Sequence, residues 1–171
     1  MILDTSAFIQ GFDPQKSVFF TVPKVRDEVK GTYASIRLEN AFETGKLHIV
    51  QPEHRFIMQI EEKSVNMGEA SSLSRTDKEL LALAIQVKAE NQEPVIVSDD
   101  YSIQNMAETL GIKYLGLATP GIKKRLTWSI YCPGCKRIYS KPQKDGVCPI
   151  CGTELRRKPK RQTMKKGSKN L

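Results

Sequence analysis

Four cysteines in two closely spaced pairs constrain the fold of this chain more than any other feature of its sequence. They lie in CPGC at 132–135 and CPIC at 148–151, with twelve residues between the pairs. Two residues between thiolates let both sulfurs face one ion from a tight turn, and two such turns complete a tetrahedral site. We therefore expect one structural zinc ion on Cys132, Cys135, Cys148 and Cys151. An iron site or redox disulfides are the alternatives.

The rest of the chain favours metal over disulfides. The N-terminus, MILDTSAF, lacks the basic and long apolar regions of a secretory signal. The longest strongly apolar run, LLALAI at 80–85, is too short to cross a bilayer. We expect a cytoplasmic protein with no membrane contact, and its thiols are then free to bind metal.

Charge is divided unevenly along the sequence. Residues 1–121 hold 12 Lys and Arg against 17 Asp and Glu, a net charge of −5, whereas residues 122–171 hold 15 against 2, a net charge of +13. Such asymmetry indicates a polyanionic partner, most simply nucleic acid or anionic lipid. A tail that only keeps the protein in solution is the plainer interpretation.

Short apolar runs alternate with helical patterns up to residue 117. We expect strands over 1–3, 17–22, 46–50, 95–97 and 113–117. We expect helices over 24–44, 53–65, 76–87 and 102–110. Strands that alternate with crossover helices predict an α/β fold, a three-layer α/β/α arrangement with a mostly parallel sheet.

Composition then suggests four segments. Residues 1–121 form the α/β domain, 122–128 a linker around a Pro-Gly break, and 129–155 the zinc ribbon. Residues 156–171 are basic and poor in apolar side chains, so we expect a disordered basic tail. Within the first domain, the Thr76-x-x-Glu79 pattern predicts a capping box that begins a helix.

Acidic residues fall where strands end and helices begin. Asp4 ends the first strand, Asp99 and Asp100 follow the strand at 95–97, and Asp77 and Glu28 lie in helices. The carboxyl ends of parallel strands share one edge of a sheet, so these carboxylates converge. Singly, each has a plain explanation as a helix cap or a solvated side chain. Together they repel one another unless cations bind, and oxygen ligands suit Mg²⁺ or Mn²⁺. Metal-dependent phosphodiester hydrolysis is the natural reaction.

Four blocks of the sequence resemble the ordered signature blocks of PIN-domain nucleases. They are ILDTSAFI, VPKVRDEV, LSRTDKELLALA and VIVSDDYSIQN, and they span most of residues 1–117. A PIN-like domain followed by a CPGC…CPICG ribbon and a basic tail is similar to the archaeal Nob family. That resemblance implies an endoribonuclease that matures the 3′ end of small-subunit ribosomal RNA.

The resemblance also implies roles for individual residues. The metal-ligating acids would be Asp4, Glu28, Asp77 and Asp100, with Asp99 the alternative to Asp100. Thr5 and Ser6 resemble family residues that help position the metal or the phosphate. Ser98 stands where the family often has threonine, which keeps the hydroxyl.

Basic and aromatic side chains in the C-terminal part could hold RNA. We expect phosphate contacts from Lys123, Lys124, Arg125, Lys136, Arg137, Lys141 and Lys144. Trp128, Tyr131 and Tyr139 could stack on unpaired bases, or could instead pack the small ribbon core. The partner would be precursor ribosomal RNA within the small ribosomal subunit.

Three other interpretations stay open. A toxin-like PIN ribonuclease would act on tRNA or mRNA, but the ribbon argues against it. A non-catalytic RNA-binding assembly factor would tolerate loss of an acid, whereas this sequence keeps the full set. A zinc-ribbon DNA-binding regulator lacks support because no recognition-helix pattern is present.

Overall fold

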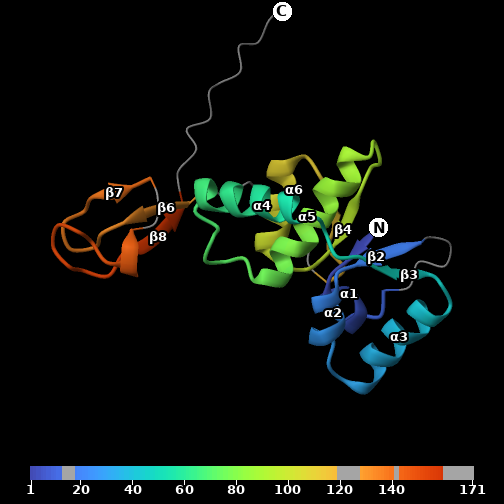
Figure 1. Cartoon of the computed structure of the whole chain (residues 1–171). Helices are drawn as coiled ribbons and strands as arrows, with labels where there is room; N and C mark the ends of the chain where they lie inside the picture. Colours follow the sequence, from blue (N-terminus) through green and yellow to red (C-terminus); the bar gives the residue numbers. More distant parts are fainter. Residues whose placement is uncertain (13–17, 119–127, 141–142, 160–171) are drawn as a thin grey trace, which may run out of the picture. The chain divides into compact units, whose positions relative to one another are not determined.

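The computed structural model describes residues 1–12, 18–118, 128–140 and 143–159 (Figure 1). The chain divides into two compact units, residues 1–125 and 126–171, which are described separately. The expected linker at 122–128 and the end of the basic tail lie almost entirely outside the described residues. No helix in the described ranges has the length and apolar character needed to cross a membrane.

The first unit is built on a five-stranded parallel sheet with the order β3-β2-β1-β4-β5. The strands are β1 (Ile2–Leu3), β2 (Phe19–Thr21), β3 (Leu47–Ile49), β4 (Val95–Val97) and β5 (Lys113–Leu115). β1 and β4 lie side by side at the centre, and their apolar side chains form part of the core. The expected α/β fold with a parallel sheet is confirmed.

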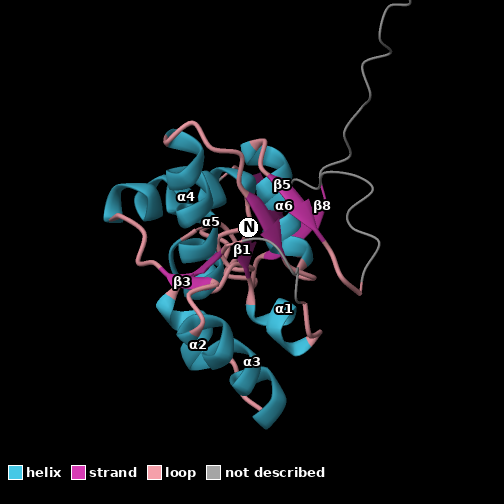
Figure 2. Ribbon diagram, turned by 90° about the vertical axis from the view of Figure 1, so that its right-hand side faces the viewer, coloured by secondary structure: helices cyan, strands magenta, loops and turns pink. Residues whose placement is uncertain are grey.

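Six helices cover this sheet (Figure 2). They are α1 (Thr5–Ile9), α2 (Pro23–Glu28), α3 (Thr32–Glu43), α4 (His54–Met67), α5 (Arg75–Ala89) and α6 (Tyr101–Leu110). α1 packs on β1 and contacts α2 and α3, whereas α5 packs on β1 and contacts α4 and α6. Right-handed crossovers from this strand order place α1–α3 on one face and α4–α6 on the other. The strand order reverses between β1 and β4, which is where doubly wound sheets bind ligands.

One expected helix is in fact two. The prediction of a continuous helix over 24–44 was wrong, because α2 ends at Glu28 and α3 begins at Thr32. Val29 is buried in an extended conformation with ψ of 100°, and Gly31 has φ of 104°. That φ lies outside the right-handed helical region and favours glycine. The break therefore lies directly after Glu28.

The capping box of α5 lies two residues earlier than expected. Ser74 is the N-cap, its hydroxyl accepts from the Asp77 amide, and the Asp77 carboxylate accepts from the Ser74 amide. Thr76 and Glu79, which were predicted to form the box, are buried inside the helix and bond to other elements. The capping-box prediction was right about the start of a helix and wrong about the residues.

The second unit is a three-stranded antiparallel sheet with the order β7-β6-β8. The strands are β6 (Trp128–Tyr131), β7 (Ile138–Tyr139) and β8 (Arg156–Pro159), and a short 3-10 turn spans Lys144–Gly146. The prediction that disorder begins at residue 156 was wrong for 156–159, since these residues pair along β6. The backbone hydrogen bonds of a β-ladder compensate for the low apolar content of this strand.

Candidate functional site

The site in the first unit begins at the adjacent carboxyl ends of β1 and β4. Asp4 follows β1 directly, and its amide donates to the Val97 carbonyl at 3.1 Å. Ser98, Asp99 and Asp100 follow β4. The parallel register of the two strands therefore brings Asp4 and the Ser98–Asp100 segment to one edge of the sheet.

Asp4 is held by three hydrogen bonds. Its Oδ1 accepts from the Thr5 amide at 2.7 Å, and its Oδ2 accepts from the Ser6 hydroxyl at 3.0 Å and the Ser98 hydroxyl at 2.7 Å. Burial raises the pKa of Asp4, the three hydrogen bonds act against that rise, and the charge of Asp100 adds to it. Thr5, Ser6 and Ser98 thus all donate hydrogen bonds to the Asp4 carboxylate.

The two neighbouring acids after β4 differ in their contacts. Asp99 Oδ1 accepts from the amides of Leu117 at 2.8 Å and Ala118 at 3.0 Å, so this carboxylate holds the chain that follows β5. Asp100 is the N-cap of α6, where its Oδ1 accepts from the Ser102 amide at 2.6 Å. Asp99 therefore stabilises the chain after β5, whereas Asp100 stabilises the start of α6.

Asp77 lies in the first turn of α5 and is part of the capping box with Ser74. Burial raises the pKa of Asp77, the hydrogen bonds from Ser74 act against it, and the charges of Asp100 and Asp4 raise it further. Asp4, Asp77 and Asp100 therefore act on one another electrostatically although they are far apart in sequence.

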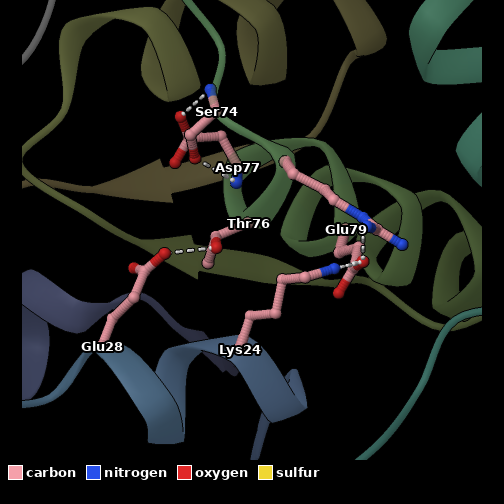
Figure 3. Close-up of polar contacts among 7 residues, drawn as sticks. Lys24, Glu28, Ser74, Thr76, Asp77 and Glu79 are labelled. Carbon is pink, nitrogen blue, oxygen red and sulfur yellow. Dashed lines mark hydrogen bonds and ion pairs between the residues drawn. The ribbon is translucent and has the colours of Figure 1, made fainter.

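Glu28 joins this group through two threonines. Its Oε2 accepts from the Thr5 hydroxyl at 3.2 Å, and its Oε1 accepts from the Thr76 hydroxyl (Figure 3). Thr76 was missed as a site residue because its place in a T-x-x-E pattern suggested a cap. Its burial on the side of α5 that meets Glu28 depends on tertiary packing.

The acids supply oxygen ligands only, and such donors fit Mg²⁺ or Mn²⁺. Their oxygens are not gathered as tightly as the ligand atoms of a bound ion. In the described ranges, the group of three or more candidate ligands that could hold an ion is the four cysteines. Their ligand atoms all lie within 4.8 Å of one another. The carboxylates are thus collected at one edge without forming a closed cage.

The four cysteines of the second unit fit a tetrahedral metal site. Sγ of Cys132 lies 3.3 Å from Sγ of Cys151, and Sγ of Cys135 lies 3.6 Å from Sγ of Cys148. Zinc–sulfur bonds in a tetrahedron imply sulfur separations of about 3.8 Å. These distances are close to that value, so the cluster could bind a metal.

A tyrosine hydroxyl supports one of these thiolates. The Tyr139 hydroxyl lies 3.0 Å from Cys148 Sγ. With this hydroxyl as the largest cause, and the amides of Ile150 and Cys151 acting in the same direction, the pKa of Cys148 falls to about 6. The contact is also the largest cause that raises the pKa of Tyr139 to about 12. The Thr153 hydroxyl, 3.3 Å from Cys151 Sγ, lowers the pKa of Cys151. Hydrogen bonds of this kind orient metal ligands and favour their deprotonated form.

Only part of the predicted RNA-binding set lies within the described residues. Lys136 and Arg137 are exposed between β6 and β7, whereas Lys123, Lys124, Arg125 and Lys141 and the side chain of Lys144 are not described. β8 adds basic side chains over aromatic rings, with Arg157 over Trp128 and Lys158 over Tyr131, each 5.0 Å from the ring centroid. The basic composition of residues 156–171 had predicted a disordered tail for these two cations.

Comparison with known proteins agrees with the fold. A profile described as the PIN domain of ribonuclease matches residues 1–87, which cover half of the chain. Together with the parallel sheet and the acids at its carboxyl edge, this match defines the chain as a PIN-domain protein.

Curated relatives narrow the assignment. The chain is 40% identical to Endoribonuclease Nob1 of Pyrococcus abyssi over 162 residues, which cover 95% of each chain. It is 35% identical to Endoribonuclease Nob1 of Methanocaldococcus jannaschii over 170 residues, 98% of this chain and 82% of the relative. It is also 40% identical to Ribonuclease VapC1 of Thermoplasma acidophilum over 111 residues, 65% of this chain and 54% of the relative. The chain belongs to the Nob1 endoribonuclease family.

Proposed function

We propose that this chain is a divalent-metal-dependent endoribonuclease that hydrolyses one phosphodiester in precursor 16S ribosomal RNA and so generates its mature 3′ end. Family membership gives the reaction class, endonucleolytic cleavage of RNA in ribosomal RNA maturation. The observation that carries the proposal is the strand pairing that brings Asp4 and the Ser98–Asp100 segment to one edge of the sheet. Asp77 interacts electrostatically with Asp4 and Asp100, and Glu28 is joined to the residue after Asp4 by the Thr5 hydroxyl.

One or two Mg²⁺ or Mn²⁺ ions would be held by the acid group, which consists of Asp4, Glu28, Asp77 and Asp100. Such an ion lowers the pKa of water and stabilises the negative charge that builds on the phosphate. Ser6 and Ser98 keep the Asp4 carboxylate oriented. Asp99 was a candidate ligand, but its bonds to the chain after β5 favour Asp100 in that role.

Thr5 links two parts of the acid group. Its amide donates to Asp4 and its hydroxyl donates to Glu28. Thr5 therefore contacts both the acid that follows β1 and the acid at the end of α2. We propose that Thr5 and Ser6 position ligands, and that any contact between these residues and the phosphate is secondary.

The cysteine cluster would hold one structural zinc ion. Four protein ligands fill a tetrahedral site and leave no open position for a substrate, so this ion takes no part in the cleavage. Thiolate ligation by four cysteines and one Zn²⁺ adds −2 to the unit, and residues 122–171 keep a net charge of about +11.

The basic second unit would hold the RNA of the small-subunit precursor. Residues 1–121, with a net charge of −5, repel a polyanion, whereas residues 122–171, with a net charge of +13, attract one. Lys136, Arg137 and the basic residues of β8 would contact phosphates together with Lys123, Lys124, Arg125, Lys141 and Lys144. We place the reaction in the cytoplasm, where the thiols stay reduced and can bind metal.

A toxin-like ribonuclease acting on tRNA or mRNA is the second candidate, because a VapC1 ribonuclease is 40% identical to the chain over 111 residues. The Nob1 relatives, in contrast, match over more than nine tenths of the chain, and a match of that length includes the cysteine unit. This difference in coverage favours ribosomal RNA.

Cleavage of an RNA that spans the small-subunit 3′ end, with and without Mn²⁺, tests the proposal. We expect one Mn²⁺-dependent product end, and we expect Asp4→Asn to lower the rate at least about 100-fold while RNA affinity stays nearly unchanged. Asp27→Asn, an exposed acid on α2 beside Glu28, is the matched control and keeps the rate. Cutting by Asp4→Asn at the unchanged rate would contradict the site, and preferential cutting of tRNA would favour the second candidate.

A further inference from the structure

Two polar links join α2 to α5 on the side that faces the acid group. α2 has only six residues, and Val25 is its buried side chain. Val22 and Val29, which flank the helix, are also buried. Isolated helices of this length are unstable in water, so tertiary contacts must fix its orientation. The three valines hold one face of α2 on the core, and the polar links act on another.

The first link is an ion pair between Lys24 of α2 and Glu79 of α5. The Glu79 side chain is 3% exposed and the Lys24 side chain 29% exposed. Arg75 contributes less, because its Nε lies 3.6 Å away and its side chain is 83% exposed. Glu79 Oε2 is buried with no hydrogen-bond partner among the residues that the structure describes. The buried carboxylate therefore depends mainly on Lys24.

The second link is the hydrogen bond from Thr76 of α5 to Glu28 of α2. Lys24 and Glu28 are four residues apart on α2, and Thr76 and Glu79 are three residues apart on α5, so each pair occupies one face of its helix. The two links consequently run side by side between the helices (Figure 3). The buried valines hold α2 on the core and Arg26 pairs with Glu39 of α3, and the two links add two fixed points between α2 and α5.

We propose that the Lys24–Glu79 ion pair is a positioning element of the acid group. It holds α2 at the rotation in which Glu28 meets Thr76, and thereby places Glu28 beside the acid carried by α5. This inference rests on the proposed metal-dependent function. Neither residue ligates the cation, because Glu79 is buried against Lys24 and Lys24 carries a positive charge. A buried ion pair adds little net stability compared with apolar packing, and specifying one geometry is the use for which such pairs are best attested.

Divalent-cation binding by the full-length chain tests the inference without relying on cleavage. Lys24→Met should weaken Mn²⁺ binding about 10-fold or more, measured from the electron paramagnetic resonance signal of free Mn²⁺. It should also speed amide hydrogen exchange of residues 23–28 in metal-free protein. Cleavage at saturating Mn²⁺ should return toward the unchanged rate, because the ligands themselves remain.

Three further variants make the result decisive. Lys113→Met removes the ion pair of Lys113, whose side chain is 69% exposed, with Glu93, whose side chain is 81% exposed. This control should leave Mn²⁺ affinity unchanged. Lys24→Arg keeps the charge and should retain the affinity to within about 3-fold, well short of the loss typical of a broken supporting contact. Glu79→Gln removes the buried charge, so it folds even if Lys24→Met does not, and it should weaken Mn²⁺ binding.

The outcomes separate this inference from the proposed function. Unchanged Mn²⁺ affinity in Glu79→Gln or in folded Lys24→Met, alongside loss of binding in Asp4→Asn, would overturn the inference and leave the nuclease site intact. Absence of any Mn²⁺ binding that Asp4→Asn removes would overturn the proposed function, and the inference with it.

Discussion

At the scale of single residues, two serine hydroxyls beside Asp4 each donate one hydrogen bond and accept another. Ser6 and Ser98 donate to the Asp4 carboxylate and accept from the backbone amides of Asp99 and Asp100, respectively. Each hydroxyl has one proton, so donation to Asp4 leaves only its lone pairs for the amides. The orientation of Asp4 is thereby coupled to the turn that carries Asp100.

The Tyr139 hydroxyl gives a pH-dependent prediction for the cysteine cluster. Its hydrogen bond is the largest of the causes that lower the pKa of Cys148 to about 6, so Tyr139→Phe should raise that pKa and let protons compete with the metal at higher pH. We expect metal release on acidification to begin at a higher pH and metal affinity near neutral pH to fall about 10-fold. A chromogenic zinc chelator measures both.

Tyr131→Phe is the matched control for that prediction. The Tyr131 ring packs under Lys158, whereas the contact to Cys148 comes from Tyr139. Release of metal at the same pH from Tyr139→Phe and Tyr131→Phe would show that the hydroxyl does not tune the thiolate.

Residues of the acid group could be predicted more readily than the residues that support them. Asp4 and Asp100 follow strands, and strand ends in a parallel sheet are visible in the sequence pattern. Ser74-x-x-Asp77 and Thr76-x-x-Glu79 fit the capping-box pattern equally well. The choice between them depends on which side of α5 is buried, because Thr76 and Glu79 face α2 instead of capping their own helix.

At the scale of elements, the break between α2 and α3 was not visible in the sequence. Residues 24–44 contain no proline, and one glycine in such a stretch is tolerated in many helices. The chain leaves the helical conformation at the buried Val29, which is extended, and it changes direction at Gly31, which has a positive φ. Glu28 consequently lies at the end of a short helix instead of inside a long one.

Gly31→Ala tests this account of the break. At φ of 104° an alanine is strained, although a Cβ there would meet nothing within 4 Å, so the cost is conformational. We expect the free energy of unfolding to fall by about 2–3 kcal/mol in urea denaturation, the upper part of the range for strained backbone. Gly45→Ala, at φ of 69° and equally open, should cost about 1 kcal/mol because left-handed helical backbone is better tolerated. Equal losses in the two variants would contradict the special role of Gly31.

The strand β8 shows another limit of sequence reasoning. Its residues, RRKP, carry no apolar alternation, and a basic run of this kind is typical of disordered tails. Pairing with β6 and the packing of Arg157 and Lys158 over aromatic rings hold it in place. Neither contact can be recognised without knowing that the two segments are neighbours.

At the scale of the whole molecule, the two units differ in what makes them stable. The first has a large apolar core of strands and helices. The second has short strands around four cysteines, and domains of this size usually need a metal to fold. Loss of the proposed zinc ion should therefore act on one unit only.

Chelation with a strong zinc chelator checks this difference. Trp128 is the single tryptophan of the chain and lies in β6, so its fluorescence reports on the second unit. We expect metal removal to shift its emission toward that of an exposed indole. The α-helices of the described residues all lie in the first unit, so the helical far-ultraviolet circular dichroism signal should change little. Loss of both signals in one cooperative step would contradict separate folding.

Three of the four acids stand where helices start: Asp4 caps α1, Asp100 caps α6, and Asp77 lies in the first turn of α5. The amide dipoles of a helix place partial positive charge at its start, which stabilises a nearby carboxylate by about 0.3–1 kcal/mol. Part of the mutual repulsion is therefore cancelled by the backbone itself, before any ion arrives. Scarcity of divalent ions would then silence the enzyme reversibly, and restoring them would return activity without a refolding step.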